Sequence, residues 1–230
     1  MKTFSDNSAA PQTVIVHADE RFERVYINMP VNLRIVQEEG SAVKIHVVDW
    51  QAGEACVDAE KVYRIAVEQQ GACRTELYGL ADVHGDGRVT IETHVHHAKG
   101  GGTSEQLIKF VLRDRAQGRF VGDLRIQPDA QQVEAHQTNR NLVLSDDAMM
   151  RTQPQLEIYA DDVQATHGAS TGQLDESALF YMQQRGIDVQ QARTMLVNAF
   201  MVDVIEKISD DALRKKMLQH LVDPIDGIVE

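Results

Sequence analysis

The sequence has few cysteines, few aromatic residues and no long apolar run. Its two cysteines, Cys56 and Cys73, lie too far apart for a C-x-x-C site, and we interpret both as buried free thiols in a reducing compartment. Aromatic residues make up 5% of the chain, with Trp50 its single tryptophan, which disfavours a cleft that stacks sugar rings. Because no run of about 18 apolar residues occurs, no membrane-spanning helix is expected.

Positive charge is also scarce. The chain has 23 lysines and arginines against 35 aspartates and glutamates, which gives a formal net charge of −12. This balance argues against a nucleic-acid backbone as the main partner. The N-terminal residues MKTFSDNSAAPQTV lack the apolar core of a signal peptide, so a cytoplasmic location is expected.

Catalytic and ligand-binding motifs are missing as well, since neither G-x-S-x-G nor H-E-x-x-H occurs. Residues 82–87 resemble a calcium loop, but His84 occupies a ligand position and Glu92 comes one residue early, so a tight turn is predicted. In residues 99–104 the lysine precedes the glycines, the wrong order for a phosphate loop, which favours a flexible connection. The paired carboxylates are interpreted as turn residues: Asp146/Asp147 and Asp161/Asp162.

Three histidines, His94, His96 and His97, lie within one strand-like run. His94 and His96 would point to the same face of a strand, a spacing that can hold a metal ion. The alternative is a histidine-bearing wall of the β structure, which we favour. The sequence leaves both interpretations open.

Before about residue 173 the chain consists of short β-type runs separated by turn residues. The spacing between the runs is irregular, and this pattern fits a sandwich, a barrel or a stacked solenoid equally well. The predicted strands are residues 13–16, 24–27, 33–36, 43–48, 62–67, 75–80, 89–95, 107–112, 119–126, 141–144 and 156–159.

The tail predicts three short amphipathic helices. Asp175 is expected to begin the first helix and Gly186 to end it, while Asp188 begins the second. Ser209 is expected to cap a third helix, which stops near Pro224. The three helices would form a small bundle or dock on the end of the β structure as a cap.

Residues 137–187 resemble the C-terminal part of the SufB/SufD family, the scaffold proteins of the SUF iron–sulfur cluster assembly system, and SufD more than SufB. The matching pieces keep the order and spacing of the family: NRNL (139–142), LSDDA (144–148), PQLEIYADDV (154–163), HGA (167–169) and GQLD (172–175). The resemblance implies a right-handed parallel β-helix over residues 1–172 and a C-terminal helical domain over residues 173–230. The N-terminal helical region common in the family has no counterpart here, as expected of a short homologue or a shortened chain.

The resemblance implies a non-catalytic scaffold subunit rather than an enzyme. Such a subunit would pair with a SufB-like scaffold or with itself and recruit the SufC-like ATPase through its C-terminal helices. The competing hypothesis is a stand-alone β-helical enzyme that acts on polysaccharide, because fold alone does not imply function.

The resemblance also points to candidate site residues. His167 would lie at the junction with SufB, as an iron or cluster ligand shared with the partner chain. Ala165 stands where the family often has a cysteine, so the isolated chain is expected to hold no cofactor, with any iron–sulfur cluster formed transiently at the interface. Tyr181 and Arg185, four residues apart on one helix face, are the candidate SufC contact.

Overall fold

The computed structural model describes residues 10–50 and 60–222. In these residues the chain forms twelve β-strands followed by three α-helices. Among the described helices, none is long and apolar enough to cross a membrane.

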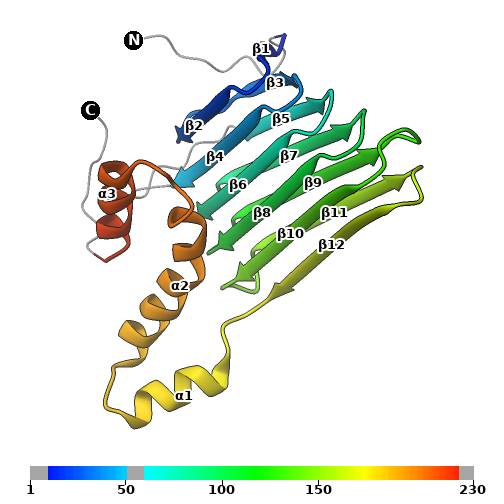
Figure 1. The fold of residues 1–230 in the computed structure, drawn as a ribbon. Coiled ribbons are helices and arrows are strands. Elements are labelled where there is room, and N and C mark those ends of the chain that lie inside the picture. The colour runs from blue at the N-terminus through cyan, green and yellow to red at the C-terminus, as the bar shows by residue number, and fades with distance from the viewer. Residues whose placement is uncertain (1–9, 51–59, 223–230) are drawn as a thin grey trace.

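The strands form two parallel six-stranded sheets, and successive strands alternate between them (Figure 1). The chain therefore winds as a flattened solenoid, which confirms the parallel β-helix that the family resemblance implied. The first sheet, sheet A, contains β1 (Gln12–Val16), β3 (Asn32–Gln37), β5 (Lys61–Gln69), β7 (Arg88–His97), β9 (Gln117–Ile126) and β11 (Met149–Ile158). The second, sheet B, contains β2 (Arg21–Ile27), β4 (Ala42–Trp50), β6 (Arg74–Val83), β8 (Thr103–Leu112), β10 (Val133–Val143) and β12 (Val163–Gly172).

Each rung of the solenoid contains one strand of each sheet. Ala42 of β4 pairs with Arg74 of β6, and Arg74 pairs with Thr103 of β8. The spacing between consecutive predicted strands is irregular because successive strands belong to different sheets, and each rung has two different connections. The repeat becomes clear only when every second strand is compared.

The main core lies between the two sheets. Alternate residues of each strand point inward, so Ile45 and Leu77 from sheet B meet Tyr63, Ile91 and others from sheet A, all of them fully buried. Each such aliphatic side chain contributes about 1.5–3 kcal/mol of burial free energy.

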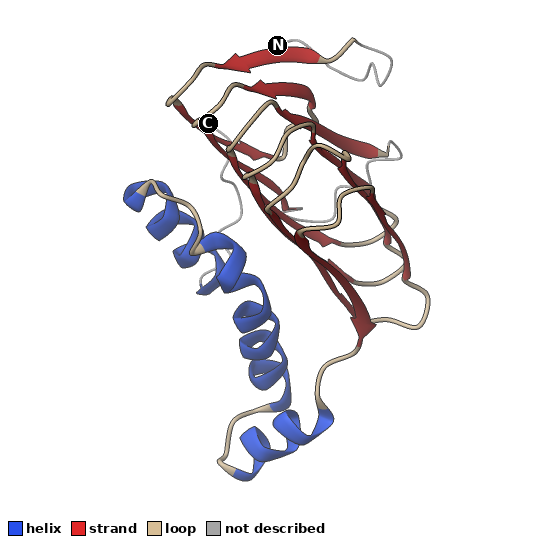
Figure 2. Cartoon of the chain, turned by 45° about the vertical axis from the view of Figure 1, so that its right-hand side comes forward, coloured by secondary structure: helices blue, strands red, loops and turns tan. Residues whose placement is uncertain are grey.

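The helices that follow the strands are α1 (Glu176–Gln184), α2 (Val189–Ile205) and α3 (Asp211–Val222). α2 and α3 lie against the outer face of sheet B, whereas α1 packs on α2 (Figure 2). Outward-facing Val48, Leu80 and Val111 make this face apolar, and they form a second buried cluster with Val204 and Ile205 of α2. The expected docking on the end of the solenoid is therefore wrong, since the apolar stripe that the helices cover runs across the strands of sheet B.

The first two helices begin as the sequence predicts. The Asp175 carboxylate accepts from the backbone N–H of Ser177, and the Asp188 carboxylate accepts from that of Gln190. Gly186, at φ 82°, follows the last turn of α1 in the left-handed conformation that glycine adopts readily.

The predicted cap of the third helix is wrong. Asp210 caps α3 by accepting from the backbone N–H groups of Ala212 and Leu213. Ser209 instead donates its own N–H to Glu23 and accepts a hydrogen bond from Lys44, so it ties the α2–α3 turn to sheet B. The predicted stop at Pro224 lies outside the described residues.

Candidate functional site

The last rung of the solenoid is its most exposed part. β12 is the end strand of sheet B and pairs with β10 on one side. Its other edge has no strand partner among the described residues, and nearly all of its residues are exposed. Such an edge presents unpaired backbone N–H and C=O groups that another strand can bind.

His167 lies in the middle of this end strand. It pairs in register with Gln137 of β10, and Gln137 pairs with Gln106 of β8. Gln106 in turn pairs with Leu77 of β6, and Leu77 pairs with Ile45 of β4, so these residues form one inward-facing row. His167 is thus the last member of a row that runs from apolar to polar residues along the interior of the solenoid.

The two glutamines of that row are buried without hydrogen-bond partners. Gln106 and Gln137 are each 1% exposed, and neither the amide nitrogen nor the oxygen of either side chain is paired within the described residues. A Cβ on Gly122 of β9 would come within 2.5 Å of Gln137 Nε2, so this glycine leaves the room that the amide occupies. Free polar groups at this depth cost folding free energy, which marks the row as a candidate for function.

The neighbouring inward positions of β10 are polar but satisfied. The Asn139 and Asn141 amides hydrogen-bond each other, at 2.8 and 3.0 Å. Asn139 also donates to the Ile108 carbonyl, and Asn141 donates to the Ser170 carbonyl of β12. These bonds hold the end strand in register beside His167.

The His167 imidazole is free to take a ligand. The ring makes no hydrogen bond or ion pair with any other residue that the structure describes, and neighbouring Gly168 has no atom within 4 Å of where its Cβ would be. The next inward residue toward the start of the strand is Ala165. This motif therefore offers one nitrogen donor and no thiolate, so a cluster ligand set would have to be completed by another chain.

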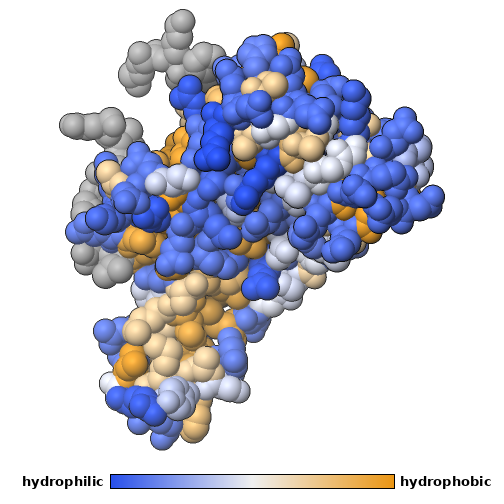
Figure 3. Space-filling view, in the orientation of Figure 1, coloured by the Kyte–Doolittle hydropathy of each residue, from blue (hydrophilic) through white to orange (hydrophobic). Residues whose placement is uncertain are grey.

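The second candidate site lies on α1. Tyr181 is 58% exposed, and the Arg185 guanidinium carbon lies 4.6 Å from the centre of its ring, so the two residues share a face as the sequence predicts. Phe180 and Met195 are also exposed. Figure 3 shows apolar surface gathering over the helical part of the molecule, whereas the surface above it is mostly hydrophilic.

An ion pair between a buried lysine and a half-exposed aspartate fixes α2 on sheet B. Lys109 of β8 is 2% exposed. It donates to the Phe200 carbonyl at 2.7 Å and to the Asp203 carboxylate, and its ammonium lies 4.5 Å from the centre of the Phe200 ring. Burial lowers the pKa of Lys109, and the hydrogen bond to Asp203 opposes this shift. This contact could not be predicted from the sequence, because its partners lie 94 residues apart.

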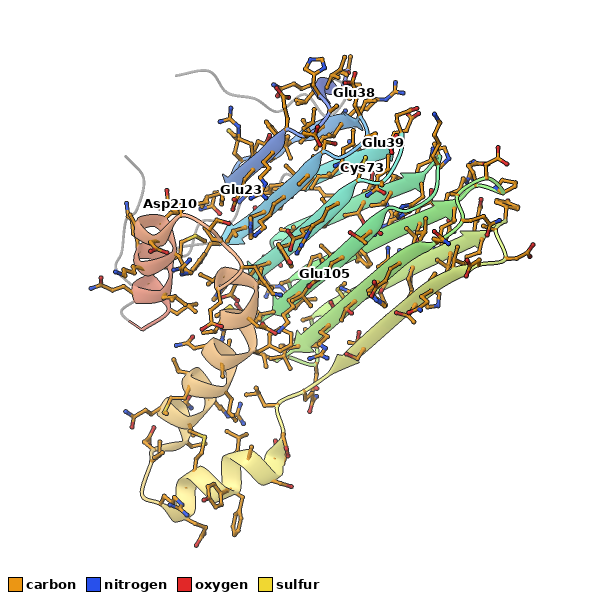
Figure 4. The ribbon with its side chains drawn as sticks, viewed as in Figure 1. Glu23, Glu38, Glu39, Cys73, Glu105 and Asp210 are labelled. Carbon is orange, nitrogen blue, oxygen red and sulfur yellow. The ribbon has the colours of Figure 1, made fainter. Side chains whose placement is uncertain are left out.

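Charged residues also surround the α2–α3 turn. Figure 4 shows Glu23 and Asp210 near that turn and Glu105 further along sheet B. Lys207 contacts Glu105 at 3.4 Å. Cys73, the described cysteine, is a buried free thiol as expected, while Cys56 lies outside the described residues.

The three histidines of β7 do not form one site. His94 faces outward, 3.4 Å from Asp123, and His96 contacts Gln127. His97 points inward, fully buried, with Nε2 2.9 Å from Ser104 Oγ. Desolvation and then nearby His96 lower the pKa of His97 to about 4. In residues 10–50 and 60–222, no group of three histidine, cysteine or acidic side chains could hold a metal ion.

The remaining motifs of the sequence lie in turns. Residues 84–87 join β6 to β7, and residues 98–102 join β7 to β8. The carboxylate pairs flank β11: Asp146 and Asp147 precede it, and Asp161 and Asp162 follow it.

Comparison with known proteins supports the family resemblance found in the sequence. The family model of the SufBD core domain of SUF system FeS cluster assembly matches residues 15–200. The chain is 36% identical over 135 residues to the iron–sulfur cluster assembly protein SufD of Escherichia coli, covering 59% of this chain. It is 35% identical over 156 residues to a SufBD family protein of Synechocystis, covering 66%, and 34% identical over 151 residues to one of Mycobacterium leprae, covering 62%.

These relatives are much longer than the region that matches. The alignments cover 32%, 34% and 38% of the three relatives, so the chain corresponds to about a third of each. The matched region includes the whole of β12 and α1.

Proposed function

Because this chain belongs to the SufBD core family of the SUF iron–sulfur cluster assembly system, we propose that it is a non-catalytic scaffold subunit whose open solenoid end binds a second scaffold chain. The observation that supports this most is the exposed edge strand β12, with His167 at the end of a buried polar row. The partner would be a SufB-like scaffold or a second copy of this chain.

The geometry of β12 suits pairing with another solenoid. A strand added to its free edge would continue sheet B by main-chain hydrogen bonds. His167 would then lie at the junction, and a partner facing the open end could offer hydrogen bonds to the amides of the row behind it. A neutral imidazole is a suitable ligand for iron, and a partner cysteine would supply the softer thiolate. The cluster is thus the cargo of the paired scaffold.

Cluster reconstitution tests this role. His167→Ala is expected to leave pairing with the SufB-like partner intact in a pull-down and to reduce the iron and visible absorbance of the complex after anaerobic reconstitution. Gln164→Ala, an exposed change on the outward side of the same strand, is the matched control. Reconstitution of His167→Ala to the wild-type level would show that this histidine has no ligand role.

Pairing itself has a separate test. Gel filtration with light scattering is expected to show a dimer of this chain or a complex with the SufB-like partner at tens of micromolar. Ala165→Pro removes an N–H donor from the free edge of β12, because alternate residues of the strand (Gln164 among them) bond to β10. This variant is expected to weaken that association. A monomer that binds no SufB-like chain contradicts the pairing proposal.

We also propose that α1 is the contact for a SufC-like ATPase. The exposed Tyr181–Arg185 pair supports this, since aromatic and arginine side chains are the usual anchors of interfaces. Tyr181→Ala with Arg185→Ala should weaken ATPase binding in a pull-down while circular dichroism stays unchanged. Gln183→Ala with Gln184→Ala, on the same helix, is the control. Equal binding by both double variants contradicts this contact.

The polysaccharide hypothesis gains no support from the aromatic residues. Trp50 packs edge-on against His220 of α3, with ring centres 4.6 Å apart, and belongs to the cluster beneath the helices. It is therefore part of the packing between helix and sheet.

A further inference from the structure

The outer face of sheet A has a regular pattern of charge pairs between neighbouring rungs. Arg34 of β3 contacts Glu68 of β5 at 3.3 Å, and Arg64 contacts Glu92 of β7 at 2.7 Å. Arg125 of β9 contacts Glu157 of β11, also at 2.7 Å. In each pair a carboxylate of the following rung neutralises an arginine.

The pattern breaks at the start of the last three strands of this sheet. Arg119 of β9 and Arg151 of β11 pair in register on adjacent strands, which lie about 4.8 Å apart, so two side chains of like charge stand side by side. Arg88, at the start of β7, is one diagonal step away, since it pairs with Gln117. Like charges directly opposite each other destabilise a sheet.

The acidic residues nearby are largely engaged elsewhere. Among the described residues, Arg151 makes no hydrogen bond or ion pair. Arg119 lies 3.8 Å from Glu92, a carboxylate that Arg64 binds more closely, and it donates a hydrogen bond to neutral Gln153 at 3.4 Å. Arg88 interacts electrostatically with Asp86, but the Asp86 carboxylate forms an ion pair with Arg115 at 2.6 Å. Glu60 accepts a hydrogen bond from Thr90.

These three arginines line one groove of about 300 Å³. It lies on sheet A, whereas α2 and α3 pack on sheet B. The remaining lining residues are Glu60, Val89, Thr90, Gln117, Gly118 and Met149. Three guanidinium groups against one carboxylate make the groove strongly positive, in a chain whose net charge is −12.

We propose that this groove binds a small oxyanion with two or more negative charges, of the phosphate or carboxylate class. The planar guanidinium fork binds either group through two parallel hydrogen bonds. Adjacent Arg119 and Arg151 can clamp one anionic group, while Arg88 on the diagonal contacts a second. The volume is at the lower end of the usual range for small-molecule sites, which favours a compact ligand. The ligand would supply the counter-charge that the rung lacks.

Calorimetry on the full chain tests the site, with pyrophosphate and citrate as the two probes. At low ionic strength we expect saturable binding of at least one probe, and the preferred probe identifies the phosphate or the carboxylate class. Arg119→Gln with Arg151→Gln should weaken that binding about tenfold or more, since a hydrogen bond to a charged group contributes about 1.5–3 kcal/mol.

The matched control is Arg34→Gln with Arg125→Gln, which removes the same charge from the same face of the sheet. It should change the dissociation constant by less than about twofold. An equal loss in both double variants would show that the anion is attracted only by general charge, and absence of saturable binding of both probes at millimolar concentration also overturns the proposal.

Thermal unfolding gives an independent readout. The wild-type midpoint should rise when the bound probe is added, and the Arg119→Gln/Arg151→Gln midpoint should not. Without a probe, the variant should unfold at the same or a higher temperature, because the repulsion between the two arginines is gone. A probe-induced rise of equal size in the variant contradicts the site.

Discussion

The two ends of the solenoid interior differ in chemistry although they share one fold. In the row that ends at His167, the early rungs have Ile45 and Leu77, which are fully buried. The late rungs have Gln106 and Gln137 in the same row. In this row the early rungs have apolar side chains, which stabilise the fold, whereas the late rungs, toward the open end, have polar groups that a partner can satisfy. We therefore interpret the early rungs as the stabilising part and the late rungs as the binding part.

A cavity in the early rungs should have the largest effect. Leu77→Ala removes a completely buried side chain and should lower the free energy of unfolding by about 2–5 kcal/mol. Leu156→Ala, at the half-buried end of sheet A, should cost clearly less. Urea unfolding followed by circular dichroism measures both. Equal losses would contradict the division between the two ends.

Acid should also act on the buried part. The pKa of His97 is about 4 in the folded chain because burial disfavours its charged form, against about 6.5 in an unfolded chain. The unfolded state therefore binds the proton first, and stability is lost as the pH falls from about 6.5 to 4. The loss is on the order of 3 kcal/mol for this group.

Unfolding curves between pH 7 and pH 4 measure that loss. His46, also buried, has a pKa lowered to about 4, chiefly by desolvation, and should add to the effect. His97→Asn should flatten the pH dependence, whereas His167→Gln controls for removing an exposed imidazole. An unchanged slope in His97→Asn would exclude His97 as the cause.

The same difference between the ends explains which strands could be predicted. Every predicted run overlaps a strand of the structure, but the run at residues 141–144 reaches only the end of β10, and β12 was not predicted. Strand prediction relies on apolar residues at alternate positions. The inward positions of β10 and β12 include Gln137, Asn139 and His167, so the signal disappears where the interior becomes polar.

The position of the helices could not be predicted for a related reason. Their caps at Asp175 and Asp188 depend on local hydrogen bonds, which the sequence shows directly. Their docking surface includes Val48, Leu80 and Val111 from three different strands. These residues can be recognised as one stripe only when the register of sheet B is known. The same holds for the row that leads to His167.

The smallest effect is expected at the polar row itself. Gln137→Met keeps the length of the side chain but removes an amide that has no partner among the described residues. The free energy of unfolding of the isolated chain should rise by roughly 1 kcal/mol, since a buried unsatisfied polar group costs about 1–3 kcal/mol. If the row serves a partner, the same change should weaken pairing with the SufB-like scaffold or with a second copy.

Urea unfolding and a pull-down measure the two effects separately, with Leu77→Met as the control for a sulfur-containing side chain in the same row. A variant that is more stable and pairs normally would mean that the polar row is not needed for the interface, whereas a less stable variant would mean that the amide is satisfied within the chain.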